Sequence, residues 1–430
     1  MTLVNINARR LWQRIMSMAE IGATSLGGSS RLALTDEDRC GRDLFIEWCR
    51  QANCEVRIDR LGNIFARRPG TDPECLPIAC GSHLDTQPLG GRFDGVFGVL
   101  AGLEVLETLN DNGIQTRSPL EVCVWTNEEG ARFTPPMLAS GVHAGVYSLE
   151  YALARQDDHG ISLAEALEAI GYVGEVACGS HRLGAFLEAH IEQGPVLERE
   201  QKTVGVVSGV QGSRWYRVSL TGQEAHTGST PMLGRRDALA AAARLIVEVQ
   251  AIADAHAPLA VASVGHIENV PNSPNTLSGQ VELTIDMRHP RVEGQASMES
   301  ALRQASAKVA EDTSVVVQLN RIMDTPPVDF HPDCIEVIEE AASSRGYRYR
   351  RMLSGAGHDA CHLAGVTPTA MIFVPCAGGL SHNEAESAEL NDLAAGTNVL
   401  LDAMLHLAEQ PPEADQVRAS ATAAAECSQH

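Results

Sequence analysis

The fold is decided at Leu120-Glu-Val-Cys-Val-Trp-Thr-Asn-Glu-Glu-Gly130, where an apolar run ends in two adjacent glutamates. The run alternates and is rich in Val and Trp, which predicts a β-strand. Consecutive residues at a strand's end point in different directions. One of Glu128 and Glu129 can therefore bind a metal ion while the other faces a water molecule on that ion. Such a pair makes hydroxide at neutral pH, because the metal lowers the pKa of water to about 7 and the free carboxylate accepts the proton.

Adjacent acids taken alone are more typical of a solvated edge, but three further segments favour a metal site. In Leu76-Pro-Ile-Ala-Cys-Gly-Ser-His-Leu-Asp-Thr86 an apolar strand ends in His83, a common metal ligand. A ligating His needs an acceptor for its second ring nitrogen, and the carboxylate of Asp85 is placed to serve. Asp94 follows in Gly90-Gly-Arg-Phe-Asp-Gly-Val-Phe-Gly98, before an apolar helix, and its two oxygens can bridge two cations.

The other two segments place His190 and His382 after apolar runs. They are Ala185-Phe-Leu-Glu-Ala-His-Ile-Glu-Gln-Gly194 and Thr369-Ala-Met-Ile-Phe-Val-Pro-Cys-Ala-Gly-Gly-Leu-Ser-His-Asn-Glu384. The carboxyl ends of strands are where ligands bind in open α/β sheets. Five ligands sharing one carboxylate suit two metal ions about 3.5–4 Å apart. The predicted set is His83, Asp94, Glu129, His190 and His382.

Together these segments resemble those of the M20 metallohydrolase superfamily, in particular its amidase/hydantoinase/carbamoylase branch, over about residues 5–408. That branch holds N-carbamoyl-L-amino-acid hydrolases, β-ureidopropionases and allantoate amidohydrolases. His190 marks the branch, because peptidase relatives usually have a carboxylate there. The resemblance implies one metal ion on His83, Asp94 and His190, a second on Asp94, Glu129 and His382, and Glu128 as the general base. The donor set suits zinc, manganese, cobalt or nickel alike.

The resemblance also assigns substrate contacts. It implies that His226, in Gln223-Glu-Ala-His-Thr-Gly-Ser-Thr-Pro-Met232, stabilises the oxyanion, and that Asn275 and Arg288 bind the substrate carboxylate. A guanidinium suits bidentate carboxylate binding. Gln193 and Gly357 match further substrate contacts. Taken singly, a loop His, a turn Asn and an Arg at a strand's end are more often ordinary surface residues.

The element pattern predicts an α/β fold of two modules. Residues 1–212 and 330–408 alternate helix and strand patterns, including a helix at 42–51, a hairpin at 55–66 and a helix at 96–109. Residues 213–329 read βαββαβ, which predicts an inserted ferredoxin-like sandwich. The resemblance implies that this insert is a lid through which two subunits dimerise. Residues 409–430 lack apolar periodicity and are predicted to be disordered.

Composition excludes several function classes. The formal net charge of −22 argues against a nucleic-acid partner. Eleven cysteines without a Cys-x-x-Cys favour a reducing cytoplasm over a disulfide scaffold. Residues 1–7 lack a basic-then-apolar pattern and no apolar run reaches about 18 residues, so neither an export signal nor a membrane span is expected.

The predicted activity is hydrolysis of the carbamoyl C–N bond of a small anionic ureido acid. An intact ligand set favours an enzyme over a binding protein that has lost its chemistry. The alternatives are an allantoate or ureidoglycolate amidohydrolase and an N-acyl-amino-acid amidase or peptidase. Allantoate-specific members carry an arginine where this chain has Trp215, which argues against allantoate, although the neighbouring Arg214 can compensate and Trp215 is equally compatible with a core strand residue.

Overall fold

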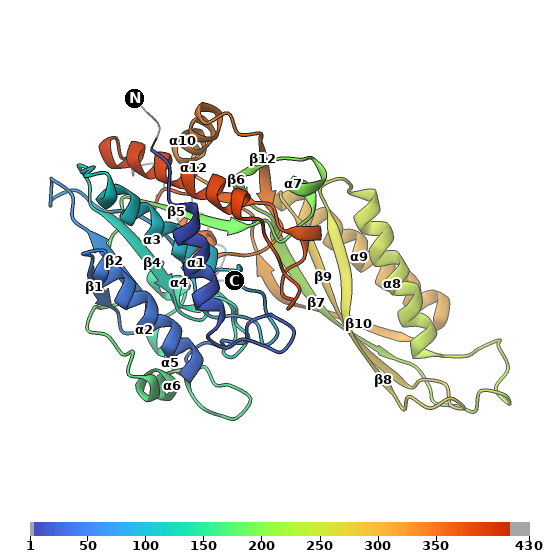
Figure 1. Cartoon of the computed structure of the whole chain (residues 1–430). Coiled ribbons are helices and arrows are strands. Elements are labelled where there is room, and N and C mark those ends of the chain that lie inside the picture. The colour runs from blue at the N-terminus through green and yellow to red at the C-terminus, as the bar shows by residue number, and fades with distance from the viewer. Residues whose placement is uncertain (1–3, 413–430) are drawn as a thin grey trace. The chain divides into compact units, whose positions relative to one another are not determined.

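The computed structural model of the chain describes residues 4–412, which divide into two compact units. Unit 1 comprises Met1–Gly209 and the chain from Asp329 onward, and unit 2 is Val210–Val328. Figure 1 shows the two units with their helices and strands. Residues 409–430 were predicted to be a disordered tail, and residues 413–430 of it lie outside the described residues. Its first residue, Glu409, instead ends a helix.

Unit 1 is built on a mixed nine-stranded sheet with four parallel strands at its centre (Figure 1). Every residue of these four strands is buried, as expected for a sheet covered on both faces. In spatial order they are β4 (Leu120–Trp125), β3 (Ile78–His83), β5 (Ala185–Ile191) and β13 (Thr369–Val374).

The remaining strands extend this sheet on both sides. The full order is β1-β2-β4-β3-β5-β13-β6-β11, and a further strand, β12, pairs with β6. The bounds of these outer strands are β1 Glu55–Ile58, β2 Ile64–Arg68, β6 Val204–Val210, β11 Val328–Asp329 and β12 Tyr349–Ser354. The predicted hairpin at 55–66 is confirmed, because β1 and β2 pair antiparallel.

Two long apolar helices cover the centre of the sheet. Helix α3 (Val96–Asp111) and helix α12 (Leu390–Glu409) contact each other, and both contact β3 and β5. The predicted helix at 96–109 is therefore confirmed. The other helices of unit 1 are α1 Ala8–Ala19, α2 Asp36–Gln51, α4 Leu138–His143, α5 Leu149–Leu153, α6 Leu163–Ile170, α7 Val196–Arg199, α10 Pro332–Ser344, α11 Asp359–Leu363 and the 3₁₀ turn Ala377–Gly379.

Helix α2 begins six residues before the start predicted at residue 42. The hydroxyl of Thr35 accepts a hydrogen bond from the backbone N–H of Asp38 and caps the helix. Acidic residues in the first turn face the positive end of the helix dipole. The prediction missed these charged turns because it relied on apolar periodicity, which begins later.

Unit 2 is a four-stranded antiparallel sheet with two helices (Figure 1). The chain order is β7 (Gly212–Thr221), α8 (Ala238–Ala255), β8 (Val261–Val270), β9 (Gln280–His289), α9 (Val292–Thr313) and β10 (Val316–Thr325). This is the predicted βαββαβ order, and the strands lie in the order β10-β7-β9-β8. Its role as a lid and dimerisation module stays a prediction.

The core of unit 2 lies between the sheet and its helices. Alternate residues of β7 and β9 are buried, among them Tyr216, Val218 and Ile285, and apolar residues of both helices pack on them. Trp215 lies on the other face of β7 and is 38% exposed. Its assignment as a core strand residue is therefore wrong. Successive side chains of a strand point to opposite faces, and in β7 it is Tyr216 that faces the core.

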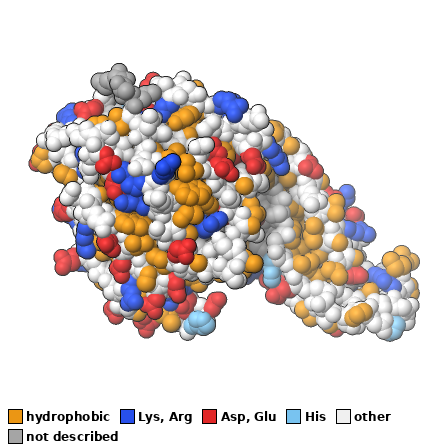
Figure 2. All heavy atoms as spheres, in the orientation of Figure 1, with side chains coloured by type: hydrophobic (Ala, Val, Ile, Leu, Met, Phe, Trp, Pro, Cys, Tyr) orange, Lys and Arg blue, Asp and Glu red, His pale blue; other side chains and the backbone are white. Residues whose placement is uncertain are grey.

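Acidic side chains are spread over the face of the molecule in Figure 2, in keeping with the formal net charge of −22. Within residues 4–412, no helix is both long and apolar enough to cross a membrane. The cysteines of the same part of the chain are all free thiols.

Candidate active site

The parallel strands bring the predicted ligands to one edge of the unit 1 sheet. His83 is the last residue of β3, and His190 is the last but one of β5. The two glutamates follow β4, and His382 lies in the loop after β13. Since the four strands are parallel, their carboxyl ends meet at the same edge.

Asp94 stands between two groups of ligands. Its Oδ1 atom lies 3.1 Å from Nε2 of His190 and 3.7 Å from Nε2 of His83. Its Oδ2 atom lies 3.4 Å from Nε2 of His382, which is 3.3 Å from Oε2 of Glu129. Within each group the donor atoms lie within 4.8 Å of one another. The structure thus brings together all five predicted ligands, with one carboxylate oxygen for each group.

The backbone fixes the tautomers of the two buried histidines. Nδ1 of His83 lies 2.8 Å from the carbonyl oxygen of Asp85, and Nδ1 of His190 lies 2.9 Å from that of Ile191. A carbonyl only accepts, so each Nδ1 carries the proton and each Nε2 presents a lone pair. The backbone N–H of Gly95 donates to Nε2 of His190 at 3.2 Å, which agrees with this tautomer.

The role predicted for the Asp85 carboxylate is corrected by these contacts. The main-chain carbonyl of Asp85, not its side chain, accepts the proton of His83. The carboxylate instead accepts the backbone N–H groups of Glu128 at 3.3 Å and Glu129 at 3.2 Å. The physical reason is the strand order: β3 and β4 are neighbours, so the segment after β3 lies beside the segment after β4. Asp85 therefore positions the glutamate pair.

The electrostatics of the cluster fit divalent cations. Burial, followed by the charge of Asp94, raises the pKa of Glu129 to about 8. Burial, followed by the charge of Asp359, raises the pKa of Glu128 well above its usual range. Burial lowers the pKa of His83 to about 4, so its ring is neutral at pH 7. Against the effect of burial, the hydrogen bond with Asp94 raises the pKa of His190 to about 9, and the hydrogen bond with Asp94 likewise raises the pKa of His382 to about 9. Divalent ions would take the place of these protons and offset the repulsion between the acids.

A third group of possible ligands lies behind the cluster. Glu188, His190 and His358 bring donor atoms within 4.8 Å of one another. Both Glu188 oxygens already accept hydrogen bonds, from Oγ of Ser82 at 2.7 Å and from the backbone N–H of Ala360 at 3.0 Å. Glu188 thus connects β5 with Ser82 of β3 and with Ala360 of α11 beside the predicted ligands.

Two residues that hold Asp94 in place, Glu386 and Ser381, were not predicted from the sequence. Glu386 accepts two hydrogen bonds from the loop of Asp94, and Ser381 bonds to both carboxylates. Gln193, predicted as a substrate contact, donates to Oδ2 of Asp94 at 2.9 Å. The sequence signal for Glu386 is weak, because only its place four residues after His382 connects it with the site.

In unit 2 the structure brings His226 and Asn275 together. Nε2 of His226 lies 3.4 Å from Nδ2 of Asn275, and the two segments form an isolated β-bridge. Nδ1 of His226 accepts the backbone N–H groups of Gly228 at 3.0 Å and Ser229 at 3.2 Å. Because Nδ1 accepts these two bonds, Nε2 is the ring nitrogen that carries the proton.

Two further predicted contacts have local partners. Arg288 forms a salt bridge with Asp286 at 2.8 Å, so a substrate carboxylate would share or displace this partner. Gly357 is exposed in the loop before α11, and a Cβ there would lie 3.0 Å from the methyl group of Met137.

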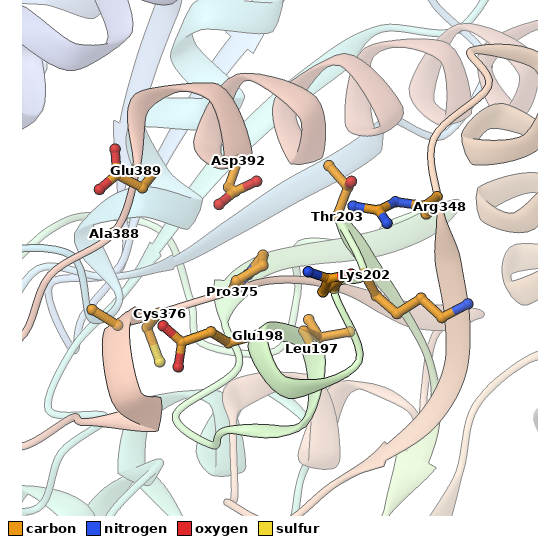
Figure 3. A pocket seen from close by; sticks show the side chains of 12 residues that line it. Leu197, Glu198, Lys202, Thr203, Arg348, Pro375, Cys376, Ala388, Glu389 and Asp392 are labelled. Carbon is orange, nitrogen blue, oxygen red and sulfur yellow. The ribbon is translucent and has the colours of Figure 1, made fainter.

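A separate cavity of about 330 Å³ lies in unit 1 (Figure 3). Lys202 and Arg348 line it together with acidic residues that include Glu389 and Asp392. None of the predicted ligands is among the residues that line this cavity in the described part of the chain. The described cavity is therefore distinct from the ligand cluster.

Comparison with known proteins places this geometry in a family. The model of Peptidase family M20/M25/M40 matches residues 79–406. An N-carbamoyl-L-amino-acid amidohydrolase of Rhizobium meliloti is 49% identical over 404 residues, covering 94% of this chain and 97% of the relative. An allantoate amidohydrolase of Escherichia coli (strain K12) is 32% identical, covering 91% and 96%.

A solved structure of an amidase of the hydantoinase/carbamoylase family from Burkholderia multivorans has a TM-score of 0.92 and 52% identity, covering 95% of this chain and 100% of that one. The α/β fold predicted from the sequence is thus confirmed. The matched region spans the four central strands of unit 1 and all of unit 2. The chain belongs to Peptidase family M20/M25/M40.

Proposed function

We propose that the protein is a metal-dependent amidohydrolase that cleaves the carbamoyl C–N bond of N-carbamoyl amino acids. With one water molecule, the products are an amino acid, ammonia and carbon dioxide. The relative from Rhizobium meliloti, which carries this activity in its name, matches nearly the whole chain.

The observation that carries the proposal is the position of Asp94. Its Oδ1 faces His83 and His190, and its Oδ2 faces His382. One divalent ion would be held by His83, Asp94 and His190, and a second by Asp94, Glu129 and His382. Bound ions would lower the pKa of a water molecule and polarise the carbamoyl carbonyl group.

Glu128 is the residue to which we assign the proton transfers. Its Oε2 lies 3.4 Å from Nε2 of His83, on the side of the ligand cluster, and the carboxylate is buried. A buried carboxylate beside the ligands can take up a proton and keep it between two steps. The carboxylate takes a proton from the attacking water and delivers it to the leaving nitrogen.

We assign substrate contacts to the residues that the resemblance implies. Arg288 and Asn275 bind the substrate carboxylate, and Nε2–H of His226 donates to the developing oxyanion. The backbone N–H bonds to Nδ1 of His226 support this role, since they fix the donor tautomer. Gln193 and Gly357 are assigned as further substrate contacts.

Allantoate is the competing substrate, in view of the relative from Escherichia coli. Arg214 was expected to be able to replace the arginine that allantoate-specific members carry at the position of Trp215. The contacts of Arg214 argue against this replacement. Arg214 forms ion pairs with Glu299 at 3.0 Å and Asp324 at 2.9 Å. Because its Nε and Nη1 donors are engaged there, Arg214 is less available to a second arm of allantoate.

The test is an ammonia-release assay. The enzyme is stripped with a chelator, reloaded with Zn²⁺, Mn²⁺, Co²⁺ or Ni²⁺, and assayed on N-carbamoyl-L-amino acids, N-carbamoyl-β-alanine, allantoate and dipeptides. We expect ammonia from a ureido acid only after metal is restored. Hydrolysis of dipeptides alone, or full activity of an Asp94→Ala variant, would contradict the proposal.

We also propose that unit 2 forms a homodimer through β8. This strand lies at the edge of its sheet and exposes Val261, Ile267 and Val270, and Val247 of the adjacent helix α8 is 63% exposed. A long apolar edge strand is a surface prone to pair with another chain. The opposite edge strand, β10, exposes Val316 and Ile322 and carries the ion pair of Arg321 with Asp324.

A further inference from the structure

Glu386 connects the two loops that carry Asp94 and His382. Its Oε1 accepts the backbone N–H of Phe93 at 2.8 Å and that of Asp94 at 3.1 Å. Its Oε2 accepts the hydroxyl of Ser381 at 2.8 Å. Phe93 and Asp94 precede α3, whereas Ser381 precedes His382, so one carboxylate joins segments almost 300 residues apart in the sequence.

Ser381 also contacts the carboxylate of Asp94. Its hydroxyl lies 3.0 Å from Oδ2 of Asp94, and the amide of Gln193 lies 3.2 Å from the same hydroxyl. A hydroxyl has one proton and therefore donates to one carboxylate at a time. When Asp94 is neutralised by bound cations, the proton of Ser381 is free for Glu386. The contact is thus compatible with an occupied site.

The side chain of Glu386 is tightly packed. Glu386 is 1% exposed. A Cβ on Gly91 would lie 2.0 Å from both the Cδ and the Oε1 atoms of Glu386. The loop of Asp94 therefore passes the carboxylate so closely that only glycine fits at position 91, and the hydrogen bonds of Glu386 hold this loop from within the protein.

We propose that Glu386 is a positioning residue for the metal centre, an inference that rests on the proposed metal-dependent function. Its carboxylate fixes the peptide of Asp94 and, through Ser381, the start of the His382 segment. The two ligands of the second metal group on these loops are thereby held at their 3.4 Å separation before any ion binds. Outer-sphere partners of this kind change metal affinity by about 10–100-fold.

If Glu386 only stabilised the fold, it would stabilise the protein equally with and without metal. Its loss would then lower the melting temperatures of the metal-free and the metal-bound protein by the same amount. A positioning residue affects the ion as well, so its loss also reduces the increase in melting temperature that metal produces.

The experiment compares Glu386→Ala, Glu386→Gln and the control Glu384→Ala in the full chain. Glu384 lies in the same loop, and its side chain is only partly buried. Co²⁺ is titrated into each chelator-stripped protein, with visible absorption, chelator competition and the melting temperature as measurements. Glutamine keeps an oxygen for the two N–H groups and an N–H₂ for the hydroxyl, so it also serves if the alanine variant does not fold.

We expect Glu386→Ala to bind Co²⁺ about 10–100-fold more weakly, and Glu386→Gln and Glu384→Ala to stay within a few-fold of the wild type. Equal Co²⁺ affinity in the wild type and Glu386→Ala would overturn the inference and leave the proposed function intact. A wild type that binds no Co²⁺, with no absorption and no change in melting temperature, would overturn both.

Discussion

At the scale of single residues, the chemistry of the site depends on which atom of each side chain faces the cluster. Asp94 presents one oxygen to each group of ligands. His83 and His190 present Nε2, because main-chain carbonyls take the proton of Nδ1. Substitutions that keep the shape of a side chain but change one atom are therefore the most informative tests.

Glu128→Gln separates the proton acceptor from the ligands. Gln has nearly the same shape but takes up no proton, so we expect kcat to fall by about 100-fold or more. Metal content, measured by atomic absorption, should stay near that of the wild type. Glu129→Gln is the matched control and should lose metal. The opposite pattern would mean that the two glutamates exchange roles.

Asp85→Asn tests how the glutamate pair is held. The wild-type carboxylate accepts the backbone N–H groups of Glu128 and Glu129, and an amide places an N–H₂ group against one of these donors. We expect kcat to fall by about tenfold or more with the metal retained, since the pair shifts while the ligands remain. Wild-type kinetics in this variant would contradict the assigned contact.

At the scale of the elements, parallel strands make the site and an antiparallel edge makes the proposed interface. Strands β3, β4, β5 and β13 are buried along their whole length, so their direction alone brings the ligands to one edge. The unit 2 sheet has two edge strands, β8 and β10, so the same substitution can be made on each and one edge can serve as the control for the other.

Ile267→Lys should convert the proposed dimer into a monomer. Ile267 is 47% exposed on β8, and a lysine on an edge strand opposes pairing with a second chain. Val316→Lys introduces the same change on β10, where Val316 is 56% exposed, and should leave the dimer unchanged. Sedimentation velocity measures both. If Ile267→Lys stays dimeric, β8 is not the interface.

At the scale of the whole molecule, the buried His143 and the partly buried His362 make the free energy of unfolding depend on pH. Burial lowers the pKa of His362 to about 4, and burial followed by the charge of His181 lowers that of His143 to about 4. Their ordinary pKa is about 6.5, so the unfolded chain binds more protons between pH 6.5 and 4. Their contribution is complete above pH 6.5 and is lost as the pH falls through this window.

Denaturant unfolding of the metal-free protein at pH 7 and pH 5 should show this loss. A shift of this size corresponds to about 3 kcal/mol per histidine when the window is crossed completely. We expect His362→Leu to lose less free energy of unfolding between pH 7 and pH 5 than the wild type. His159→Leu is the control at an exposed histidine, and it should follow the wild type. An equal loss of free energy of unfolding between pH 7 and pH 5 in all three proteins would contradict the role given to His362.

The sequence by itself determined the α/β fold, the order of elements in unit 2 and the composition of the ligand set. Period-two patterns and apolar runs are local properties, so residues 55–66 and 96–109 could be predicted from their own neighbours. His83, Asp94, Glu129, His190 and His382 could be named because each follows an apolar run, although their binding of metal stays a prediction.

Only the tertiary structure decided how these residues are held. The carboxylate of Asp85 binds the glutamate pair rather than His83, and Trp215 lies away from the core of unit 2. Glu386 reaches Asp94 across almost 300 residues. Such contacts depend on which strands become neighbours and where loops meet. They follow from packing and burial of the whole unit, which no local pattern of residues encodes.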